Sequence, residues 1–384
     1  MTHDDIRFAG IAAVSSRLML AAFLAIAATP QYAYAQKTDL VIGQSAPLTG
    51  PYAGGMSSVI AGEKLAFEEV NKRGGIYGRK ISLITLDDAF DPKRSLENAK
   101  NLAEQENAVA LFGFVGTAQT ATVLPYINER KIPLISVYSG SPALRIKANP
   151  YFFTTQASYA DELVKITRNL VAIQNSRIAI VYQDNDFGKL LQPLAEKIVV
   201  AEGGTMAISR PLAANGSDAA AVAQSLIESK PQSVILLVAG PPVVNYVKAN
   251  KAILGVPLYT LSLSINAPTI KALGDDARGV AVARATPYPW NGITALPKNF
   301  GHLMKATGKE IDYDHYVGYI NALVLIEALR KAGKNITPET VTQSMEKLNN
   351  LDLGGQRFNF SPQNHHGSNF VEITVIGSNG KFIR

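Results

Sequence analysis

The sequence predicts an α/β fold with parallel sheets and about two domains. Residues 41–88 contain a short apolar run, a loop rich in Gly and Pro, a helical pattern and a second strand that ends on Asp87 and Asp88. Such a strand–loop–helix–strand unit is the repeating piece of an open parallel sheet. The alternation continues over most of the chain, and 384 residues are enough for about two domains.

The first unit also predicts where a ligand binds. Its helical pattern places four small or apolar side chains on one face: Val59, Gly62, Ala66 and Val70. The Gly-rich turn at 74–78 ends this helix, and a strand follows at 81–86. Loops after strands lie at the carboxyl edge of a parallel sheet, where ligands bind. We therefore expect the loop at 45–57 to contribute to a site.

The N-terminus has the pattern of a secretory signal peptide. Arg7 and Arg17 precede an apolar segment at 18–28, which is too short to span a bilayer comfortably. The sequence Ala-Tyr-Ala at 33–35 is a small-residue cleavage signal. We expect residues 1–35 to be removed and Gln36 to begin the exported protein. A membrane anchor or a disordered tail is the alternative.

Composition excludes several classes of protein. The chain has no Cys, which rules out disulfides and lipid attachment at a cysteine. Its formal net charge of +6 is mild, and no basic stripe with interleaved aromatics occurs, which argues against nucleic-acid binding. No later stretch is apolar enough for a membrane-spanning helix. We expect a soluble exported protein, which in a Gram-negative cell is periplasmic.

The remaining elements follow in order. Helices are predicted near 91–106, 117–130, 158–173, 187–202, 217–229, 243–253, 294–307, 314–333 and 337–348. Strands are predicted at 108–113, 133–137, 151–154, 177–182, 205–209, 233–238, 258–262 and 279–285. After these come short strands with Gly and Asn turns at 354–384.

This order of elements predicts two lobes that are each built from separate stretches of chain. Two runs of strand–helix units are followed by helices and then by a β tail, which indicates that the late helices return to the first lobe and the tail to the second. We predict an N-terminal lobe at 36–156 plus 287–350, and a C-terminal lobe at 157–286 plus 351–384.

A series of short motifs occurs along the chain in a specific order. They are APLTGPY at 46–52, Gly62 with Ala66, Asn71 with Gly74-Gly75-Ile76 and Gly78, Asp87-Asp88 with Asp91-Pro92, Gly113 with Thr117, PLIS at 133–136, Asp184 with Phe187-Gly188, and Gly216-Ser217-Asp218. This series resembles the leucine/isoleucine/valine-binding protein family over nearly the whole exported chain. Members are solute-binding proteins of ABC importers with the type I periplasmic fold. The resemblance implies two doubly wound parallel-sheet lobes joined by three crossovers, with a ligand cleft that closes about a hinge.

The resemblance also implies a site for a ligand carboxylate. Thr117, after Gly116, falls where the family has a Ser or Thr that hydrogen-bonds this group. Ser139 and Ser141 match a loop that supplies a carbonyl for the ligand ammonium and a hydroxyl for the carboxylate. Unpaired N–H groups at a helix start suit an anion without a basic side chain. The alternatives are that Thr117 only caps its helix and that 139–141 is an ordinary turn.

Other candidates are expected to line the cleft. Tyr52 and Gly55 face it from the first loop, and Gly55 stands where a branched-chain binder has an aromatic. A missing side chain leaves room or lets backbone approach. Phe187 falls where the family often has Tyr, with core packing as the alternative. Tyr288 and Trp290 are either aromatic walls or hinge packing.

Ser262 is the largest departure from the family pattern. It occupies the position where amino-acid binders carry a Glu that pairs with the α-ammonium. Gly240 likewise lies where an aromatic is common. Both differences weaken the case for a standard α-amino acid and favour carboxylates without an amine, or amide-type solutes. If an amino acid binds after all, Asp184 or Asp186 is the expected partner of its ammonium.

No catalytic constellation is predicted. Asp87 and Asp88 are adjacent in a strand and point to opposite faces, so they cannot readily share a substrate. His365 and His366 lack further ligands at metal-binding spacing. No nucleophile elbow or Gly-Lys-Ser/Thr phosphate loop occurs. We predict no enzyme, no cofactor and no metal site.

The predicted function is that of a periplasmic solute receptor. A monomer binds a small carboxylate-bearing molecule and delivers it to a membrane ABC permease. The alternative on the same fold is a ligand-sensing regulator or receptor of the amide-sensor type. An α/β enzyme is the rival from another class.

Overall fold

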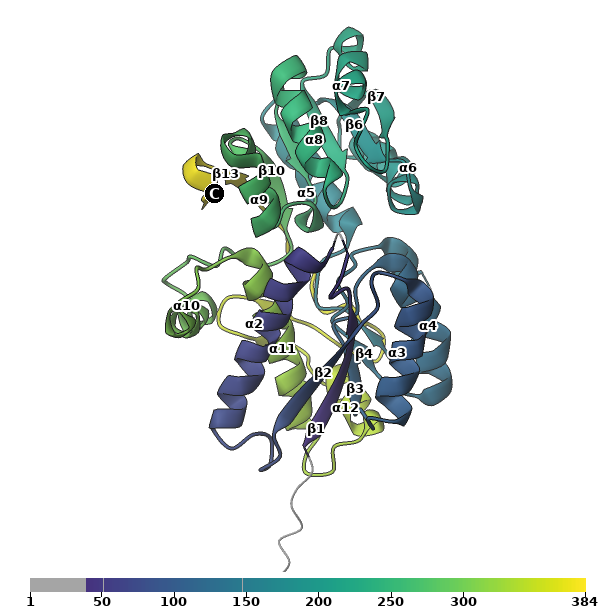
Figure 1. Cartoon of the computed structure of the whole chain (residues 1–384), viewed down its shortest axis with the longest axis vertical. Helices are drawn as coiled ribbons and strands as arrows, with labels where there is room; N and C mark the ends of the chain where they lie inside the picture. Colours follow the sequence, from purple (N-terminus) through teal and green to yellow (C-terminus); the bar gives the residue numbers. More distant parts are fainter. Residues whose placement is uncertain (1–38, 51, 147) are drawn as a thin grey trace, which may run out of the picture. The chain divides into compact units, whose positions relative to one another are not determined.

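The computed structural model describes residues 39–50, 52–146 and 148–384 (Figure 1). The expected signal peptide at 1–35 and Gln36 lie outside the described residues. Helices and strands alternate along the described chain, and the strands form two large sheets. The predicted α/β class is therefore confirmed.

The first sheet has five parallel strands in the order β2-β1-β3-β4-β5. Their bounds are β1 (Leu40–Ala46), β2 (Ile81–Asp87), β3 (Ala110–Phe112), β4 (Leu134–Ile135) and β5 (Phe152–Phe153). Helices that pack with this sheet are α2 (Ala53–Lys72), α3 (Pro92–Glu104), α4 (Thr117–Arg130), α10 (Ala295–Thr307), α11 (Tyr313–Lys331) and α12 (Pro338–Glu346).

The second sheet has seven strands in the order β14-β13-β10-β9-β8-β6-β7, in which β13 pairs antiparallel with both β10 and β14. Their bounds are β6 (Arg177–Gln183), β7 (Thr205–Leu212), β8 (Ser233–Leu237), β9 (Leu258–Thr260), β10 (Ala281–Arg284), β13 (Glu372–Ile376) and β14 (Phe382–Ile383). Its helices are α5 (Tyr159–Ala172), α6 (Asp186–Ala201), α7 (Ala219–Ser225), α8 (Pro242–Ala249) and α9 (Ala267–Leu273).

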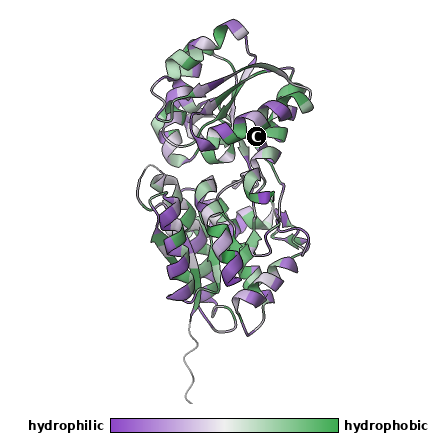
Figure 2. Ribbon diagram, turned by 90° about the vertical axis from the view of Figure 1, so that its right-hand side faces the viewer, coloured by the Kyte–Doolittle hydropathy of each residue, from purple (hydrophilic) through white to green (hydrophobic). Residues whose placement is uncertain are grey.

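Each sheet is buried on both faces, as parallel sheets require. Alternation along β6 shows this directly, because successive strand residues point to opposite faces. Ile178 and Ile180 join the core under α5 and α6, whereas Ala179 and Val181 join the core under α7 and α8. In Figure 2, green hydrophobic and purple hydrophilic residues occur on the same helices, as expected for helices that cover a sheet with one face.

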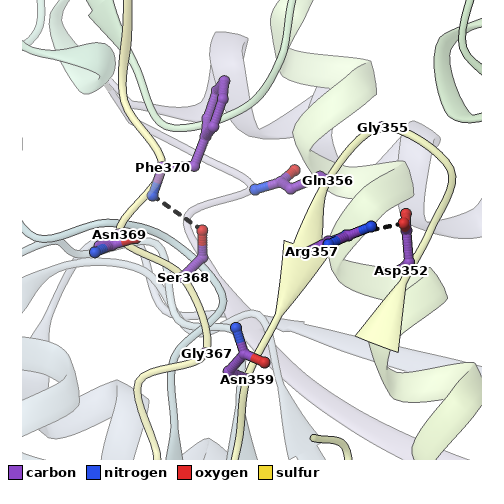
Figure 3. Close-up of a pocket in the computed structure, with 9 residues that line it drawn as sticks. All are labelled: Asp352, Gly355, Gln356, Arg357, Asn359, Gly367, Ser368, Asn369 and Phe370. Carbon is purple, nitrogen blue, oxygen red and sulfur yellow. Dashed lines mark hydrogen bonds and ion pairs between the residues drawn. The ribbon is translucent and has the colours of Figure 1, made fainter. Parts of the chain in front are cut away.

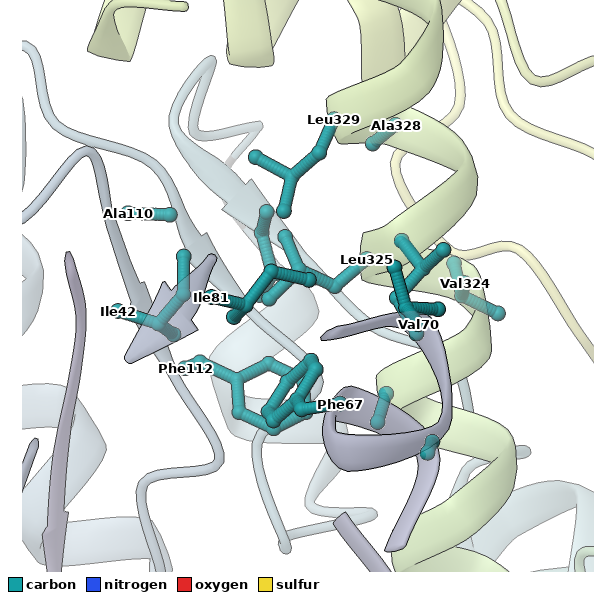
Figure 4. Packing of buried hydrophobic residues seen from close by; sticks show 14 of the residues in the cluster. Ile42, Phe67, Val70, Ile81, Ala110, Phe112, Val324, Leu325, Ala328 and Leu329 are labelled. Carbon is teal, nitrogen blue, oxygen red and sulfur yellow. The ribbon is translucent and has the colours of Figure 1, made fainter. Parts of the chain in front are cut away.

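Helices α2 and α11 are the closest-packed helix pair of the first sheet. A side chain on Gly62 would collide with the backbone of His315, and one on Gly318 would collide with the backbone of Val59. Beyond these glycines, Phe67 of α2 and helix α11 together cover the strands (Figure 4). Although α11 is largely buried, no helix in the described part of the chain has the length and apolarity to cross a bilayer.

The late segments of the chain are divided between the two sheets. Phe358 and Phe360 are buried in the core of the first sheet, and His366 bridges to Thr154 beside β5. The strands β13 and β14 then extend the second sheet. The expected boundary between the lobes at 350/351 differs from this packing. Apolar side chains after residue 351 fill the core of the first sheet.

The strands β11 (Leu351–Asp352) and β12 (Arg357–Phe358) form an antiparallel pair. This pair belongs to the lobe of the first sheet. We propose that the last passage between lobes lies near 367–371. The chain passes between the sheets three times: after β5, after β10 and before β13.

Candidate ligand-binding site

Strand order defines where a ligand fits on each sheet. In the first sheet β1 lies between β2 and β3, and in the second β6 lies between β7 and β8. At such switch points ligands bind outside the carboxyl ends of the strands. The loops or helix starts after β1, β3, β6 and β8 carry Tyr52, Thr117, Phe187 and Gly240. Strand order therefore brings these predicted residues to the two switch points.

The loop after β1 is fastened by Asp87 at the end of β2. Its carboxylate accepts hydrogen bonds from the N–H groups of Leu48 (2.9 Å) and Thr49 (3.3 Å) and from the Thr49 hydroxyl (2.7 Å). Desolvation alone would raise the pKa of Asp87. These bonds, with one from the N–H of Ala89, outweigh desolvation and lower the pKa to about 2. Asp87 therefore has a structural role, because it holds the loop after β1 and the turn at Ala89.

Phe90 forms an aromatic wall that the sequence pattern did not indicate. Its φ of 64° is unusual for a bulky residue. The N–H of Phe90 donates to buried Asp88 (2.9 Å), and its carbonyl accepts from Gln119 Nε2 (2.6 Å). The Phe90 ring lies 4.2 Å from the Tyr52 ring between centroids and beside Gly116. Asp88 thus supports this aromatic pair instead of forming an acid–base pair with Asp87.

Two hydroxyl groups meet at the start of α4. Thr117 Oγ1 lies 2.9 Å from Ser139 Oγ, so it joins the loops after β3 and β4. Gly116, with φ of 97°, is the N-cap, and Thr117 is the first residue of the helix. The Thr117 side chain therefore does not cap α4, and the first N–H groups of this helix lack intrahelical partners. The Ser141 N–H donates to Ser139 Oγ (3.3 Å), and the buried Ser141 hydroxyl has no hydrogen-bond partner among the described residues.

The start of α5 packs on the loop at 139–141, which we call the hydroxyl loop. The N–H of Tyr159 donates to the carbonyl of Gly140 (2.8 Å), and a side chain on Gly140 would overlap the Tyr159 ring. Phe187 meets the other edge of Tyr159 at a centroid distance of 5.8 Å. Phe187 is half-buried and packs against the core of the second sheet.

Gly55 and Gly240 are occupied by close contacts rather than by open space. A side chain on Gly55 would lie 2.8 Å from Asn266 Nδ2, and one on Gly240 would lie 3.2 Å from the Tyr52 ring. Gly240 also has φ of 75°, which favours glycine. At Gly55 the adjacent space is taken by the side chain of Asn266 and not by backbone. At Gly240, where the family often has an aromatic, the Tyr52 ring takes the adjacent space.

Ser262 does not leave the second sheet without a carboxylate. Its N–H donates to Glu162 Oε2 (2.7 Å) and its hydroxyl donates to Glu162 Oε1 (2.8 Å). Glu162 comes from the first turn of α5 and is almost fully buried. The comparison of position 262 with the family did not indicate this carboxylate, because it comes from another element. Asp184, the expected substitute, instead pairs at the surface with Lys189 Nζ (2.8 Å).

Arg284 holds the turn that contains Ser262. Its Nη1 donates to the carbonyls of Ser262 (3.2 Å) and Ile265 (3.1 Å). The guanidinium lies over the rings of Tyr313 (4.3 Å) and Phe382 (4.6 Å). Burial lowers the pKa of Arg284, but nearby Tyr313 and acidic groups oppose this effect. Arg284 is therefore a buried cation that orients Ser262 toward Glu162.

Tyr288 and Trp290 belong to this aromatic cluster at the crossover. The Tyr288 hydroxyl donates to the carbonyl of Phe382 (2.8 Å), and Trp290 stacks on the Phe382 ring at 6.0 Å. Trp290 also meets Tyr313 at 5.6 Å. These contacts support the hinge-packing alternative for both residues, and they attach this stretch to the second sheet.

The residues that sequence reasoning missed are Phe90, Tyr159, Glu162, Asn266 and Arg284. One signal was available for Glu162. Ile166 and Leu170 follow it at intervals of four and are both buried, so Glu162 is a carboxylate on the apolar face of a helix. No comparable pattern marks Phe90, because its position depends on a left-handed turn.

A separate hollow of about 450 Å³ lies beside the late crossover (Figure 3). Its lining includes Gln356, Asn359 and Asn369, and an ion pair joins Arg357 Nε to Asp352 at 3.0 Å. None of the predicted ligand-binding residues lines it. This hollow is therefore distinct from the candidate site.

The combination of fold and loops defines a class. Two α/β sheets, three passages of the chain between them, and polar or aromatic residues at both switch points are the features of a two-lobed solute-binding protein. The chain belongs to the periplasmic binding protein family, because the model of this family matches residues 39–381. Curated relatives that match the chain are described as Leu/Ile/Val-binding protein homologues, which are solute-binding proteins rather than enzymes.

Individual relatives agree with this assignment. Leu/Ile/Val-binding protein homolog 7 of Brucella suis is 24% identical over 381 residues, covering 89% of this chain and 90% of the relative. A branched-chain amino acid ABC transporter protein of Thermus thermophilus, solved with bound valine, matches with a TM-score of 0.79 and 20% identity, covering 91% and 95% of the two chains. A fatty acid ABC transporter substrate-binding protein of Thermomonospora curvata has the same TM-score and identity, covering 90% and 91%. These structures confirm the type I periplasmic fold.

Proposed function

We propose that the protein captures a small carboxylate-bearing solute between its lobes and delivers it to the permease of an ABC importer. The observation that supports this proposal most is the Thr117–Ser139 hydroxyl pair at the start of α4. Two hydroxyls and unpaired helix N–H groups can hold a carboxylate without a basic side chain. The Tyr52–Phe90 pair at the neighbouring loops would enclose the apolar part of the solute.

The relatives support the same proposal at the level of ligand class. The similar structures include proteins for branched-chain amino acids and for fatty acids, and both kinds of ligand carry a carboxylate. Both of these proteins are described as parts of ABC transporters, which supports delivery of the solute to an ABC permease. We propose further that the chain acts as a periplasmic monomer after removal of residues 1–35.

Thr117→Ala tests the carboxylate site. We expect affinity for the bound acid to fall by about tenfold or more, because a hydrogen bond to a charged group contributes about 1.5–3 kcal/mol. A thermal-shift panel of amino acids and amino-free carboxylic acids first identifies a ligand, since saturation at about 100 times Kd stabilises the protein by about 2.7 kcal/mol. Calorimetry then compares wild type and variant.

The matched control is Thr122→Ala on the same helix, where the hydroxyl only bonds back to the carbonyl of Ala118. This variant should bind as wild type does. Equal affinities for all three proteins would remove Thr117 from the site. A panel without any stabilising acid would contradict the proposed function itself.

A further inference from the structure

Tyr138 joins the two loops that carry the Thr117–Ser139 hydroxyl pair. Its N–H donates to the carbonyl of Phe114 (2.7 Å), and its carbonyl accepts from the N–H of Gly116 (3.2 Å). Ser139 follows Tyr138 directly in the chain, and Thr117 follows Gly116. The position of Tyr138 therefore affects both hydroxyl groups of the pair.

The side chain of Tyr138 is held in turn by Glu63 of α2. Its hydroxyl donates to Glu63 Oε1 (2.8 Å), and Gln44 Nε2 donates to Glu63 Oε2 (2.8 Å). The Thr85 hydroxyl donates to Gln44 Oε1 (2.9 Å), which fixes the orientation of this amide. A side chain on Gly113 would lie 2.9 Å from Glu63 Oε1. Glu63 thus contacts β1 and the segments that follow β3 and β4.

Glu63 is fully buried and has no cationic partner. Among the described residues, no Lys, Arg or His nitrogen lies within 4.0 Å of its carboxyl group. Two hydrogen bonds from neutral groups do not offset the cost of burying a charge. Burial accordingly raises the pKa of Glu63 to about 8, against the opposing effects of Gln44, Tyr138 and Lys64. At neutral pH Glu63 therefore carries a proton.

A neutral group at this position suits a site that binds an anion. Only the Tyr138 side chain and one hydrogen bond separate Glu63 from the hydroxyl loop. An ionised Glu63 would repel a solute carboxylate bound at the Thr117–Ser139 pair, and the buried surroundings would screen this repulsion poorly.

We propose that Glu63 is a positioning residue for the carboxylate site: its neutral form holds Tyr138 and the hydroxyl pair in place, and its ionisation weakens binding of the solute carboxylate. This inference rests on the proposed function and adds a pH-dependent regulation of the same site. Binding of a carboxylate favours the neutral form of Glu63, so at pH 8 the protein should take up a proton from the buffer when the solute binds.

Other titratable groups near this network must be separated from Glu63 in the experiment. Lys64 adjoins it on α2, and α11 contributes Asp314, which acts on Tyr138, and His315, which packs on Gly62. Burial raises the pKa of Tyr138 well above its ordinary value, and it raises the pKa of Asp314 to about 7. The effect of Glu63 is therefore defined by comparing wild type with a Glu63 variant in the same buffers.

The test measures affinity and proton uptake as functions of pH. The probes are L-leucine, L-phenylalanine, 4-methyl-2-oxopentanoate, phenylpyruvate and octanoate, and the tightest binder is titrated into the exported form of the chain by calorimetry. We expect the wild-type Kd to rise by at least about threefold from pH 7 to pH 9, as charge repulsion across one side chain predicts. Titration at pH 8 in buffers of different ionisation enthalpy measures the proton taken up.

Glu63→Gln places a neutral amide of the same shape behind the loop at every pH. Its Kd should change by less than that of wild type between pH 7 and pH 9, and its proton uptake at pH 8 should be lost. The matched control is Glu68→Gln, an exposed glutamate on the same helix. This control should keep the wild-type pH profile.

A second pair of variants tests the role of Tyr138 in positioning the site. Tyr138→Phe removes the bond to Glu63 and should weaken binding at pH 7 by at least about threefold, because a neutral hydrogen bond contributes about 0.5–1.5 kcal/mol. Tyr126→Phe is the control, since its hydroxyl donates to Glu104 Oε1 (3.0 Å) and lies outside the candidate site. Tyr126→Phe should bind as wild type does.

The outcomes separate this inference from the proposed function. If the probe binds but wild type and Glu63→Gln have the same pH profile, the role of Glu63 is overturned and the proposed function stands. Binding of no probe at millimolar concentration would contradict the proposed function. Hydrogen exchange at pH 9 in the ligand-free proteins then still tests positioning: residues 134–145 should exchange faster in wild type than in Glu63→Gln, and equal rates would overturn it. If Glu63→Gln does not fold, the wild-type proton uptake and the Tyr138→Phe comparison decide.

Discussion

At the scale of single residues, buried carboxylates are a recurring feature of this chain. Glu63 of α2 is fully buried and accepts hydrogen bonds from Gln44 Nε2 and the Tyr138 hydroxyl, both at 2.8 Å. Burial raises the pKa of Glu63 to about 8, although these two bonds lower it. Tyr138 immediately precedes Ser139, so this group lies directly behind the hydroxyl loop.

Glu63 should make stability decrease with rising pH. Its folded pKa is higher than its ordinary value of 4.5, so the folded protein binds a proton more tightly than the unfolded chain. The stabilisation is complete below about pH 4.5 and is lost as pH rises toward about 8, at up to about 1.4 kcal/mol per pH unit. Urea unfolding of Glu63→Gln at pH 5–8 should show a weaker decrease than wild type.

Glu68→Gln is the control for this prediction, because it changes an exposed glutamate on the same helix. Its unfolding free energy should follow the wild-type pH dependence. A wild-type protein whose stability is flat over this range, or a Glu63→Gln variant with the same slope, would contradict the role of Glu63.

The site residues show which kinds of position a sequence reveals. Thr117 and Ser139 were predicted because each follows a recognisable strand in a motif of fixed order. Glu162 was not, because its partner Ser262 is one hundred residues away and only the fold brings them together. Gly55 suggested either open room or an approach of backbone, whereas the structure places beside it the side chain of Asn266, a residue from another part of the chain.

At the scale of elements, the contact between α2 and α11 depends on two glycines. Gly62 faces the backbone of His315, while Gly318 faces the backbone of Val59 and Glu63. The sequence pattern predicted that Gly62 shares a face with Ala66 and Val70, and both are buried there. It did not identify the opposing helix, since α11 begins some 250 residues later in the chain.

Gly62→Ala should therefore destabilise the protein. The added methyl group cannot fit against backbone atoms, so the helices must separate, and overpacking of this kind costs about 1–3 kcal/mol. The control is Gly301→Ala in α10, where the new carbon would meet only the end of Ile311 at an ordinary 3.5 Å. That change should stabilise slightly, because alanine favours helices over glycine by about 0.5–1 kcal/mol. Thermal unfolding that ranks the two variants in the opposite order would contradict this packing argument.

At the scale of the whole molecule, strand and helix periodicity was sufficient to predict two sheets and their helical layers. The order of elements along the chain did not determine how residues 351–384 are divided between the two lobes. Phe358 and Phe360 are short aromatic signals within an irregular stretch, and only their burial in the first core shows where that stretch belongs. The sequence likewise allows Tyr288 either to line the cleft or to pack at the hinge. The hydrogen bond from its hydroxyl to the Phe382 carbonyl is visible only in the structure.

The last prediction concerns processing of the whole chain. The pattern from Arg7 to Ala35 predicts cleavage that leaves Gln36 as the first residue. The first strand begins at Leu40, whose N–H bonds to the carbonyl of Lys80 at 2.7 Å. Cleavage after Ala35 therefore leaves β1 and its hydrogen bonds complete, and it removes no part of the described fold.

Mass spectrometry of the protein from a periplasmic extract should give the mass of residues 36–384. Ala33→Asp places a charge in the small-residue signal and should block cleavage, so that an uncleaved chain accumulates with the membrane fraction. Thr38→Ala changes a residue just beyond the cleavage point and should be processed normally. Folded, uncleaved wild-type protein in the cytoplasm would contradict export and, with it, the proposed delivery of solute to a permease.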